Sequence, residues 1–503
     1  MFLNIGPDKL AFYILEFDIR AIKSALDCCQ IRIAESVTKS PPDRDLTAVL
    51  AENLAALDYQ ALSEADRTQI KRLILDHVGV CRRGAEQSWC LALREWAGRY
   101  AGSGTSVVFG SALRTAPNVA AMVNASAAHG MELDDTHDSS VSHPGAVVIA
   151  TALALGIHHQ ASGGDIMAAI AAGYEAMGRA GRAVGAPNVI EHGYHPTALF
   201  GGFGAAAAAG KLLGLDGPGI ASAWGLMLSM AGGSMQFSED PLGTTVKRLH
   251  GGYGAHNGTL AAEFATLGIA GPSRALDGRY GLGRLFGQNP DFSELARAQG
   301  APLEIHRISM KPYPCCRLFH STIDALRDVT DNFSLDTGVI AEIRVGGPAI
   351  MCTQHMLRRP ISVMAAQYSL PFSLATSLVY GPDAYEAYGE DKFEDSRVLG
   401  LADKVEAVED KKMEAAFPDH FGSWVEVRTA SGNTRRADIL DSIGTPARPM
   451  DTDALKDKIT GLLAPLETAP KIADIAAAVQ DFEQESGPAR LIALFATAEP
   501  KAA

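Results

Sequence analysis

Two long runs of small apolar residues, 145–157 and 197–213, dominate the hydrophobic pattern of the chain. Each run is apolar around its whole circumference, which is typical of a helix buried on all sides. Each also follows a His-Pro dipeptide, and proline favours the first position of a helix. Between residues 118 and 267 the chain is rich in alanine and glycine and poor in strand formers, which predicts one all-helical domain with a thick core.

The pattern changes after about residue 303. Apolar and polar residues alternate over 339–345, and again over 424–429 before the turn residues of 430–433. A period of two predicts strands, and the second strand should enter a hairpin. Helical spacing returns over 455–463 and 472–482, and we expect these C-terminal helices to pack back on the first domain.

The predicted fold class is mainly α, with a large all-helical domain and a smaller α+β domain. We place an N-terminal extension at 1–44, the first part of the helical domain at 45–303, the α+β domain at 304–443, and the helices that complete the helical domain at 444–503. Ser63 and Asp66 have the spacing of a capping box at the start of the first clear helix. A cleft between two domains is a common place for a small-molecule site.

Charge and cysteine content limit the classes of partner. The chain has 44 basic and 58 acidic side chains, a net charge of −14, which argues against nucleic acid or an anionic membrane as partner. We find no apolar run long enough for a transmembrane helix and no secretory signal at the N-terminus. The seven cysteines form no CxxC pair, so a reducing, cytoplasmic setting fits best.

The two His-Pro dipeptides suggest acid/base chemistry. They place His143 and His195 at helix caps, where the positive end of the helix attracts anions and disfavours imidazolium. A neutral imidazole that accepts a proton is therefore plausible at both positions, next to a carboxylate of a substrate. The alternative is that each histidine only caps its helix.

Acids and imidazoles are concentrated between His129 and His143, including Glu132, Asp134 and Asp135. Three interpretations fit this segment: a metal site, an acid/base cluster, or capping acids on a surface helix end. The spacing does not separate them.

Two further segments combine cations with unusual backbone residues. Lys247, Arg248 and His250 precede several glycines, which suits a carboxylate group but also a basic helix end on the surface. Two prolines hold Lys311 in an extended loop before the Cys315-Cys316 pair. The cysteines allow two interpretations, a nucleophile or a structural buried pair. Neither cysteine has an evident base partner in the sequence, which a nucleophile would need.

Taken together, five segments resemble the MmgE/PrpD family, which includes 2-methylcitrate dehydratases, cis-aconitate decarboxylases and iminodisuccinate epimerases. The segments are HGMELDDTHDSSVSHPGAVV, HGYHPTALFGGFGAAAAAGKLLGL, VKRLHGGYGAHNG, KPYPCCRLFH and RPISVMAAQYSLPF. They occur in the order of the family and cover about residues 46–480. The resemblance implies an all-helical domain, an α+β lid domain, a homodimer, and catalysis with no metal or organic cofactor.

The resemblance also implies the site residues. The catalytic residues would be His143, His195, Lys247, Lys311 and Tyr368, and the substrate-binding residues would be Asp134, Asp135, Thr136, His250 and Cys316. Two positions depart from the family: Glu132 stands where many members have aspartate, and Cys316 stands where the mammalian decarboxylase has histidine.

The function favoured by the sequence is a cofactor-independent lyase on a small di- or tricarboxylate, most simply a 2-methylcitrate-type dehydratase. Two histidines in different environments can divide the roles of base and acid, while lysines hold carboxylates. Decarboxylation of cis-aconitate and epimerisation of an iminodisuccinate-like substrate need much the same groups and remain alternatives. A protein that binds a carboxylate without turnover is an alternative from another class.

Overall fold

The computed structural model describes residues 45–240, 244–296 and 300–496, so the N-terminal extension predicted at 1–44 lies outside the described residues. The described residues from Leu46 onward form one unit in which helices predominate. The mainly α fold class with a smaller sheet-containing part is confirmed. The domain boundaries placed after residues 44, 303 and 443 stay predictions. We call residues 46–303 and 444–496 the helical region, and residues 304–443 the sheet region.

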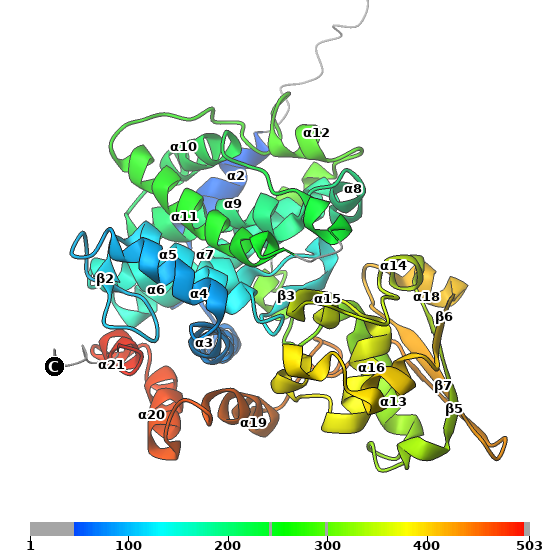
Figure 1. Cartoon of the computed structure of the whole chain (residues 1–503). Coiled ribbons are helices and arrows are strands. Elements are labelled where there is room, and N and C mark those ends of the chain that lie inside the picture. The colour runs from blue at the N-terminus through cyan, green and yellow to red at the C-terminus, as the bar shows by residue number, and fades with distance from the viewer. Residues whose placement is uncertain (1–44, 241–243, 297–299, 497–503) are drawn as a thin grey trace, which may run out of the picture. The chain divides into compact units, whose positions relative to one another are not determined.

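The helical region is built around α9 (Figure 1). Its helices are α2 (Leu46–Ala56), α3 (Glu64–Gly84), α4 (Ser88–Gly98), α5 (Pro117–His129), α6 (Pro144–His158), α7 (Gly163–Val184), α8 (Ala186–Glu191), α9 (Pro196–Leu212), α10 (Gly217–Leu228), α11 (Val246–Thr266) and α12 (Leu282–Phe286). Helix α9 packs against α7, α11 and α6, and its residues from Pro196 to Gly210 are all buried. The uniform small apolar surface of this helix explains why it is covered on every side.

Glycines allow the close contact between α9 and α11. A Cβ atom at Gly258 would lie 2.4 Å from the carbonyl oxygen of Gly202 on α9, so any side chain there would force the two helices apart. The glycines of α11 therefore serve helix packing, as the small-residue pattern of this region predicts.

Of the C-terminal helices, α19 (Thr452–Leu463) and α20 (Ala469–Gln480) pack next to α3, and α21 (Gly487–Ala493) packs on α20 and α6. Ile459 of α19 and Ile475 of α20 belong to the same buried cluster as Ile70 and Ile74 of α3. The predicted capping box at the start of α3 is confirmed, because the Ser63 side chain accepts from the Asp66 amide and Asp66 accepts from the Ser63 amide. The helical spacing of the C-terminal segments is also confirmed.

The sheet region contains a four-stranded sheet with the order β6-β5-β7-β8. The strands are β5 (Ile340–Gly347), β6 (Val405–Glu409), β7 (Ser423–Thr429) and β8 (Thr434–Ile439), with β6 parallel to β5 and the other pairs antiparallel. Both strands expected from the alternating pattern exist, and β7 enters the expected hairpin.

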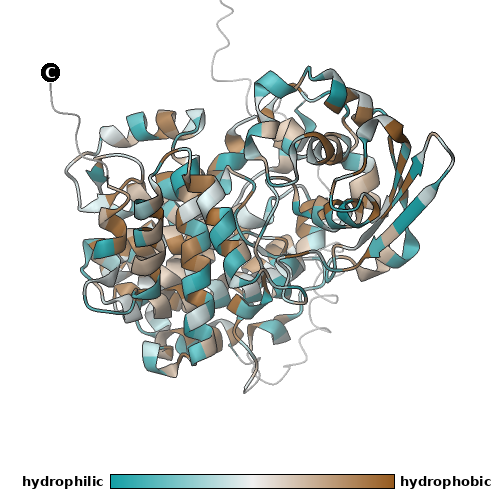
Figure 2. Ribbon diagram, turned by 90° about the horizontal axis from the view of Figure 1, so that it is seen from below, coloured by the Kyte–Doolittle hydropathy of each residue, from teal (hydrophilic) through white to brown (hydrophobic). Residues whose placement is uncertain are grey.

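Helices cover the inner face of this sheet. The helices of this region are α13 (His320–Val329), α14 (Ala349–Gln354), α15 (Val363–Gln367), α16 (Leu370–Tyr380), α17 (Ser396–Ala402) and α18 (Lys411–Ala416). Helix α13 packs directly on β7 and β8, and α16 packs on α13, α15 and α17 (Figure 1). The edge strand β8 is largely exposed and hydrophilic (Figure 2). Its charged residues Arg435, Arg436 and Asp438 discourage pairing with another strand.

Two short ladders complete the secondary structure. Strand β1 (Ser106–Val107) pairs with β2 (Arg114–Thr115), and β3 (Thr136–His137) pairs with β4 (Ile308–Ser309). In the part of the chain that the structure describes, no helix is long and apolar enough to span a membrane.

Candidate active site

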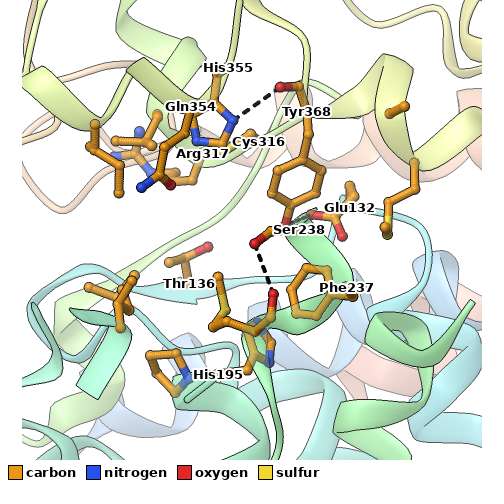
Figure 3. Close-up of a pocket in the computed structure, with 18 of the residues that line it drawn as sticks. Glu132, Thr136, His195, Phe237, Ser238, Cys316, Arg317, Gln354, His355 and Tyr368 are labelled. Atoms are coloured by element: carbon orange, nitrogen blue, oxygen red, sulfur yellow. Dashed lines mark hydrogen bonds between the residues drawn. The ribbon is translucent and has the colours of Figure 1, made fainter. Parts of the chain in front are cut away.

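A pocket of about 510 Å³ opens between side chains of the helical region and of the sheet region. Six of the ten residues predicted for the site line it: Thr136, His143, His195, Lys311, Cys316 and Tyr368. Figure 3 shows Cys316, Arg317, Gln354, His355 and Tyr368 on one side, facing Thr136, His195 and Phe237 on the other. The other four, Asp134, Asp135, Lys247 and His250, are buried behind this wall.

The β3–β4 ladder brings distant parts of the sequence together at this wall. Thr136 pairs with Ser309, so the segment that follows α5 lies beside the segment that leads to Lys311. The backbone amide of Met310 also donates to the carbonyl of Gly444 at 2.9 Å. These contacts hold Lys311 against the acidic segment from Glu132 to Asp135.

Glu132 is the centre of a buried ionic cluster. Its carboxylate accepts a hydrogen bond from Lys247, lies 3.5 Å from Lys311 Nζ, and accepts from the Tyr368 hydroxyl at 3.3 Å. Lys247 and Lys311 are at most 1 % exposed. The Lys247 segment is therefore not a basic helix end on the surface, which was one of its two interpretations from the sequence. Glu132 has a φ of 55°, in the left-handed region that favours glycine, and such strain is often kept at functional sites.

The charges of this cluster stabilise each other. Burial alone would raise the pKa of Glu132. The opposite effect of Lys247 and Lys311 together is larger, so the pKa lies below its usual value. Burial lowers the pKa of Lys311, but Glu132 and Asp134 raise it above its usual value. Burial, aided by Glu132, raises the pKa of Tyr368 well above its usual value. A carboxylate, an ammonium group and a phenol that keeps its proton therefore meet at one wall of the pocket.

His143 is held as a neutral base at the start of α6. Its Nδ1 donates to the carbonyl of Asp135 at 2.9 Å, which leaves Nε2 of the neutral ring without a proton. Burial lowers the pKa of His143 to about 3. The ring makes no capping hydrogen bond to α6, although the residue occupies the N-cap position. The interpretation of His143 as only a helix cap is therefore wrong.

His195 occupies the same position before α9 and also makes no side-chain capping bond. Its Nδ1 lies 3.0 Å from Nδ1 of His250, so one ring donates and the other accepts. Burial lowers the pKa of His195 well below its usual value, and it lowers the pKa of His250 to about 4. His250 thus contacts the candidate catalytic ring rather than the pocket itself.

His129 was not selected as a site residue from the sequence, yet it stands between the two predicted catalytic histidines. Its ring centroid lies 5.2 Å from that of His143 and 5.7 Å from that of His195. Nδ1 donates to Asp134 Oδ2 at 2.7 Å, and Nε2 has no hydrogen-bond partner among the described residues. The ring is fully buried at the end of an Ala-rich helix, and the sequence placed His129 in the cluster of acids and imidazoles without assigning it a role.

The two neighbouring aspartates have different surroundings. Asp134 contacts His129 and lies 3.5 Å from Lys311 Nζ. Asp135 points away from the pocket, where it accepts from the Tyr174 hydroxyl at 2.6 Å and from the Gly145 amide at 2.7 Å. Burial raises the pKa of Asp135 to about 7. The structure therefore places Asp134 near the reacting groups and Asp135 in the support of α6.

The remaining predicted residues also have defined places. Thr136 Oγ1 lies 3.3 Å from His143 Nδ1. Burial raises the pKa of the Cys316 thiol to about 11, which argues against a thiolate nucleophile. The basic Arg248 is not at the pocket, since it donates to the carbonyl of Gly130 and stacks 4.0 Å above the Trp89 ring.

Gln367 is a further residue that the sequence did not single out. Its side-chain NH₂ group donates to the carbonyls of Met131 and Pro314, both at 3.1 Å, and its backbone carbonyl accepts from the Cys316 amide at 2.9 Å. It connects the segments that carry Glu132, Cys316 and Tyr368. Its place within the segment RPISVMAAQYSLPF was the only signal available for it.

Among the described ranges, no group of three or more histidine, cysteine or acidic side chains is arranged to hold a metal ion. The acids and imidazoles of 129–143 instead contact lysines, a tyrosine and one another. What the arrangement offers chemically is a base at His143, a second imidazole at His195, and ammonium and hydroxyl donors at Lys311 and Tyr368.

Comparison with known proteins identifies the family. The model of the MmgE/PrpD N-terminal domain matches residues 48–295, and that of the C-terminal domain matches residues 313–484. The chain is 26% identical over 485 residues to the cis-aconitate decarboxylase-like protein oryM of Aspergillus oryzae, an alignment that covers 91% of this chain and 99% of that protein. It is 26% identical to a cis-aconitate decarboxylase of Aspergillus terreus, over 80% of this chain and 86% of that enzyme. It is 27% identical to the cis-aconitate decarboxylase of Homo sapiens, over 72% and 76%. With both family domains matched over most of its length, the chain belongs to the MmgE/PrpD family.

Proposed function

We propose that the protein is a cofactor-independent lyase that decarboxylates a small unsaturated carboxylate. The family and its relatives support a lyase acting on a small carboxylate. The sequence alone favoured dehydration, whereas the relatives named above, all called decarboxylases or decarboxylase-like, favour the decarboxylation that the sequence left as an alternative.

One observation carries the proposal: Lys311, His143 and His195 face a single pocket. The ammonium group of Lys311 binds a carboxylate that the substrate keeps, and the Tyr368 hydroxyl donates to it. Two imidazoles with lowered pKa values stay neutral at physiological pH and can exchange protons with substrate carbon.

Decarboxylation with a shift of the double bond accounts for the groups present. The C–C bond to the departing CO₂ breaks, and its electron pair forms a new C=C bond. The original double bond then takes one proton at its far carbon. A His195 ring that has taken up a proton from solvent donates its Nδ1 proton in a hydrogen bond to His250, delivers its Nε2 proton to that carbon and returns to the neutral form. Lys311 stabilises the negative charge that builds up on the retained carboxylate.

Dehydration stays a second candidate because His143 is organised as a base. Its unprotonated Nε2 can remove a proton next to a carboxylate, while a protonated group releases the hydroxyl as water. The same residues are therefore used in both reactions, and product analysis separates them.

The test is incubation of the purified full chain with cis-aconitate and with 2-methylcitrate, followed by NMR and by measurement of CO₂. Decarboxylation gives new methylene signals together with CO₂. Dehydration of 2-methylcitrate at the methyl-bearing carbon converts the methyl doublet into a singlet without release of CO₂, and epimerisation in D₂O gives exchange of the α proton alone. The variant Lys311→Met serves as the inactive control. If none of these changes occurs with any carboxylate of a panel, the protein binds a carboxylate without turnover and the proposal is wrong.

A further inference from the structure

The walls of the pocket are of two kinds. The ionic and titratable groups described above meet one another at Glu132, Lys311 and the histidines. Much of the remaining lining is apolar and comes from both regions: Val141, Met235 and Phe237 from the helical region, and Leu318, Ile350 and Phe421 from the sheet region. A substrate that met only the ionic groups would leave this apolar surface in contact with water.

The volume is also larger than a compact acid requires. A pocket of about 510 Å³ falls within the range of roughly 300–1,000 Å³ that accommodates drug-sized ligands. A six-carbon acid with three carboxylates is smaller than such ligands, and it has little apolar surface to bury.

The charges of the lining are unfavourable for a substrate with many carboxylates. The cationic side chains among the described lining residues are Lys311 and Arg317, and the carboxylate of Glu239 adds negative charge. Arg317 is already paired, with its guanidinium 2.9 Å from Asp138 Oδ2 and 3.1 Å from the Ser442 hydroxyl. A carboxylate placed against the apolar wall would lose hydration without gaining a cation.

From this distribution we propose that the substrate carries an apolar substituent, an alkyl chain or an aromatic ring, on the carbon skeleton beside the carboxylate that Lys311 binds. This inference rests on the proposed function, because it names the substrate class of the same pocket. The carboxylate end lies at Lys311 and Tyr368, and the substituent lies along Met235, Ile350 and Phe421.

Binding of stable analogues tests the substrate class without any turnover. Isothermal titration of the full chain with succinate, butylsuccinate and hexylsuccinate compares ligands of equal charge and increasing apolar length. Each CH₂ group that is fully buried should tighten binding by about three- to fourfold. The affinity of hexylsuccinate should therefore exceed that of succinate by well over tenfold. Equal or weaker binding of the alkylsuccinates would overturn the inference.

Variants of the apolar wall show where the alkyl chain of the ligand binds. Met235→Gln and Ile350→Asn each place a polar group in the lining, so each should reduce the ratio of the succinate Kd to the hexylsuccinate Kd severalfold. The matched control is Met230→Gln, a half-buried methionine outside the lining, which should leave this ratio unchanged. If both wall variants keep the full ratio, the alkyl chain lies elsewhere and the inference fails.

The two proposals fail in different ways. If cis-aconitate is decarboxylated but alkylsuccinates bind no better than succinate, the substrate class is wrong and the lyase stands. If alkylsuccinates bind in the expected order but neither cis-aconitate nor its alkyl-substituted forms are converted, the substrate class stands and the lyase is wrong.

Discussion

His129 Nδ1 lies 2.7 Å from Asp134 Oδ2, and both side chains are buried beside the two candidate catalytic histidines. Because the Asp134 carboxylate accepts the Nδ1 proton, the neutral His129 ring presents an unprotonated Nε2 between His143 and His195. Asp134 also faces Lys311 at 3.5 Å. One carboxylate thus orients an imidazole and partly neutralises the ammonium group that we assign to substrate binding.

The variant Asp134→Asn tests this relationship. The amide keeps the shape of the side chain but removes the charge that fixes the tautomer of His129. We expect kcat to fall by at least about tenfold, with an upper bound of about 10⁴-fold, the loss seen when the tautomer of a His–Asp pair is reversed. Steady-state kinetics across pH measures the effect. The control Asp216→Asn changes an exposed N-cap of α10 and should have normal kinetics, because asparagine caps about as well as aspartate.

The two histidines at the pocket wall should be individually required. His143→Ala and His195→Ala should each lower kcat by about 10²-fold or more, the usual scale for a general acid or base. Since neither ring caps its helix, loss of capping should not contribute to any change in stability. His192→Ala, an exposed histidine three residues before His195, is the matched control. Near-normal kcat in both pocket variants would remove the histidines from the mechanism.

The ionic cluster at Glu132 should show strong energetic coupling. Lys311→Met leaves Glu132 and Asp134 with fewer partners in a buried site, and breaking such a pair typically costs about 3–5 kcal/mol of unfolding free energy. Adding Asp134→Asn should restore part of this loss, because Asp134 loses its ammonium partner in Lys311→Met, whereas Glu132 keeps Lys247. Urea unfolding of the single and double variants measures the coupling.

The exposed pair of Arg359 and Asp403 provides the comparison, since both side chains are about half exposed and such pairs contribute only about 0–1 kcal/mol. Loss of stability in Lys311→Met no larger than in Arg359→Met would contradict a buried ionic cluster.

Metal removal is a further test. Glu132 is the carboxylate best placed in the pocket wall to bind a cation, but the ammonium groups of Lys247 and Lys311 already contact it and would repel a divalent ion. We expect dialysis against EDTA to leave kcat/KM unchanged. Loss of activity that one added metal restores would contradict this and would revive the metal-site interpretation of residues 129–143.

Much of the fold follows from local sequence signals. Proline at the first helical position places the starts of α6 and α9 at Pro144 and Pro196, where the structure has them. The period of two over 339–345 locates β5, and the turn after Thr429 locates the hairpin of β7 and β8. These signals are strong because they act over neighbouring residues. The homodimer and the cytoplasmic location stay predictions.

The site was harder to predict, because its arrangement depends on long-range contacts. Strands β3 and β4 have two residues each, too few for any periodicity, yet they bring Lys311 beside Glu132. The family resemblance placed both Asp134 and Asp135 in the substrate site, and only the fold shows that Asp135 faces Tyr174. His129 was noted only as part of the acid and imidazole cluster and Gln367 was not singled out, because nothing in their local pattern indicates which buried groups they contact.

The last prediction concerns stability against pH. Burial lowers the pKa of His143 to about 3, against about 6.5 in an unfolded chain, so below pH 6.5 the unfolded state binds a proton that the folded state does not. His143 therefore makes stability fall as pH falls from about 6.5 towards 3, by at most about 1.4 kcal/mol per pH unit. Asp134, Lys311 and His129 are the charged or titratable groups that face it.

Asp135 acts in the opposite direction. Burial raises its pKa to about 7, so between pH 7 and about 4 the folded state binds the extra proton, and this contribution to stability grows as pH falls. Urea unfolding at pH 6.5, 5.5 and 4.5 should thus give opposite results for two variants. His143→Gln should lose less stability on acidification than the parent protein, and Asp135→Asn should lose more. Parallel pH dependence in all three proteins would show that neither group is held in the protonation state assigned to it here.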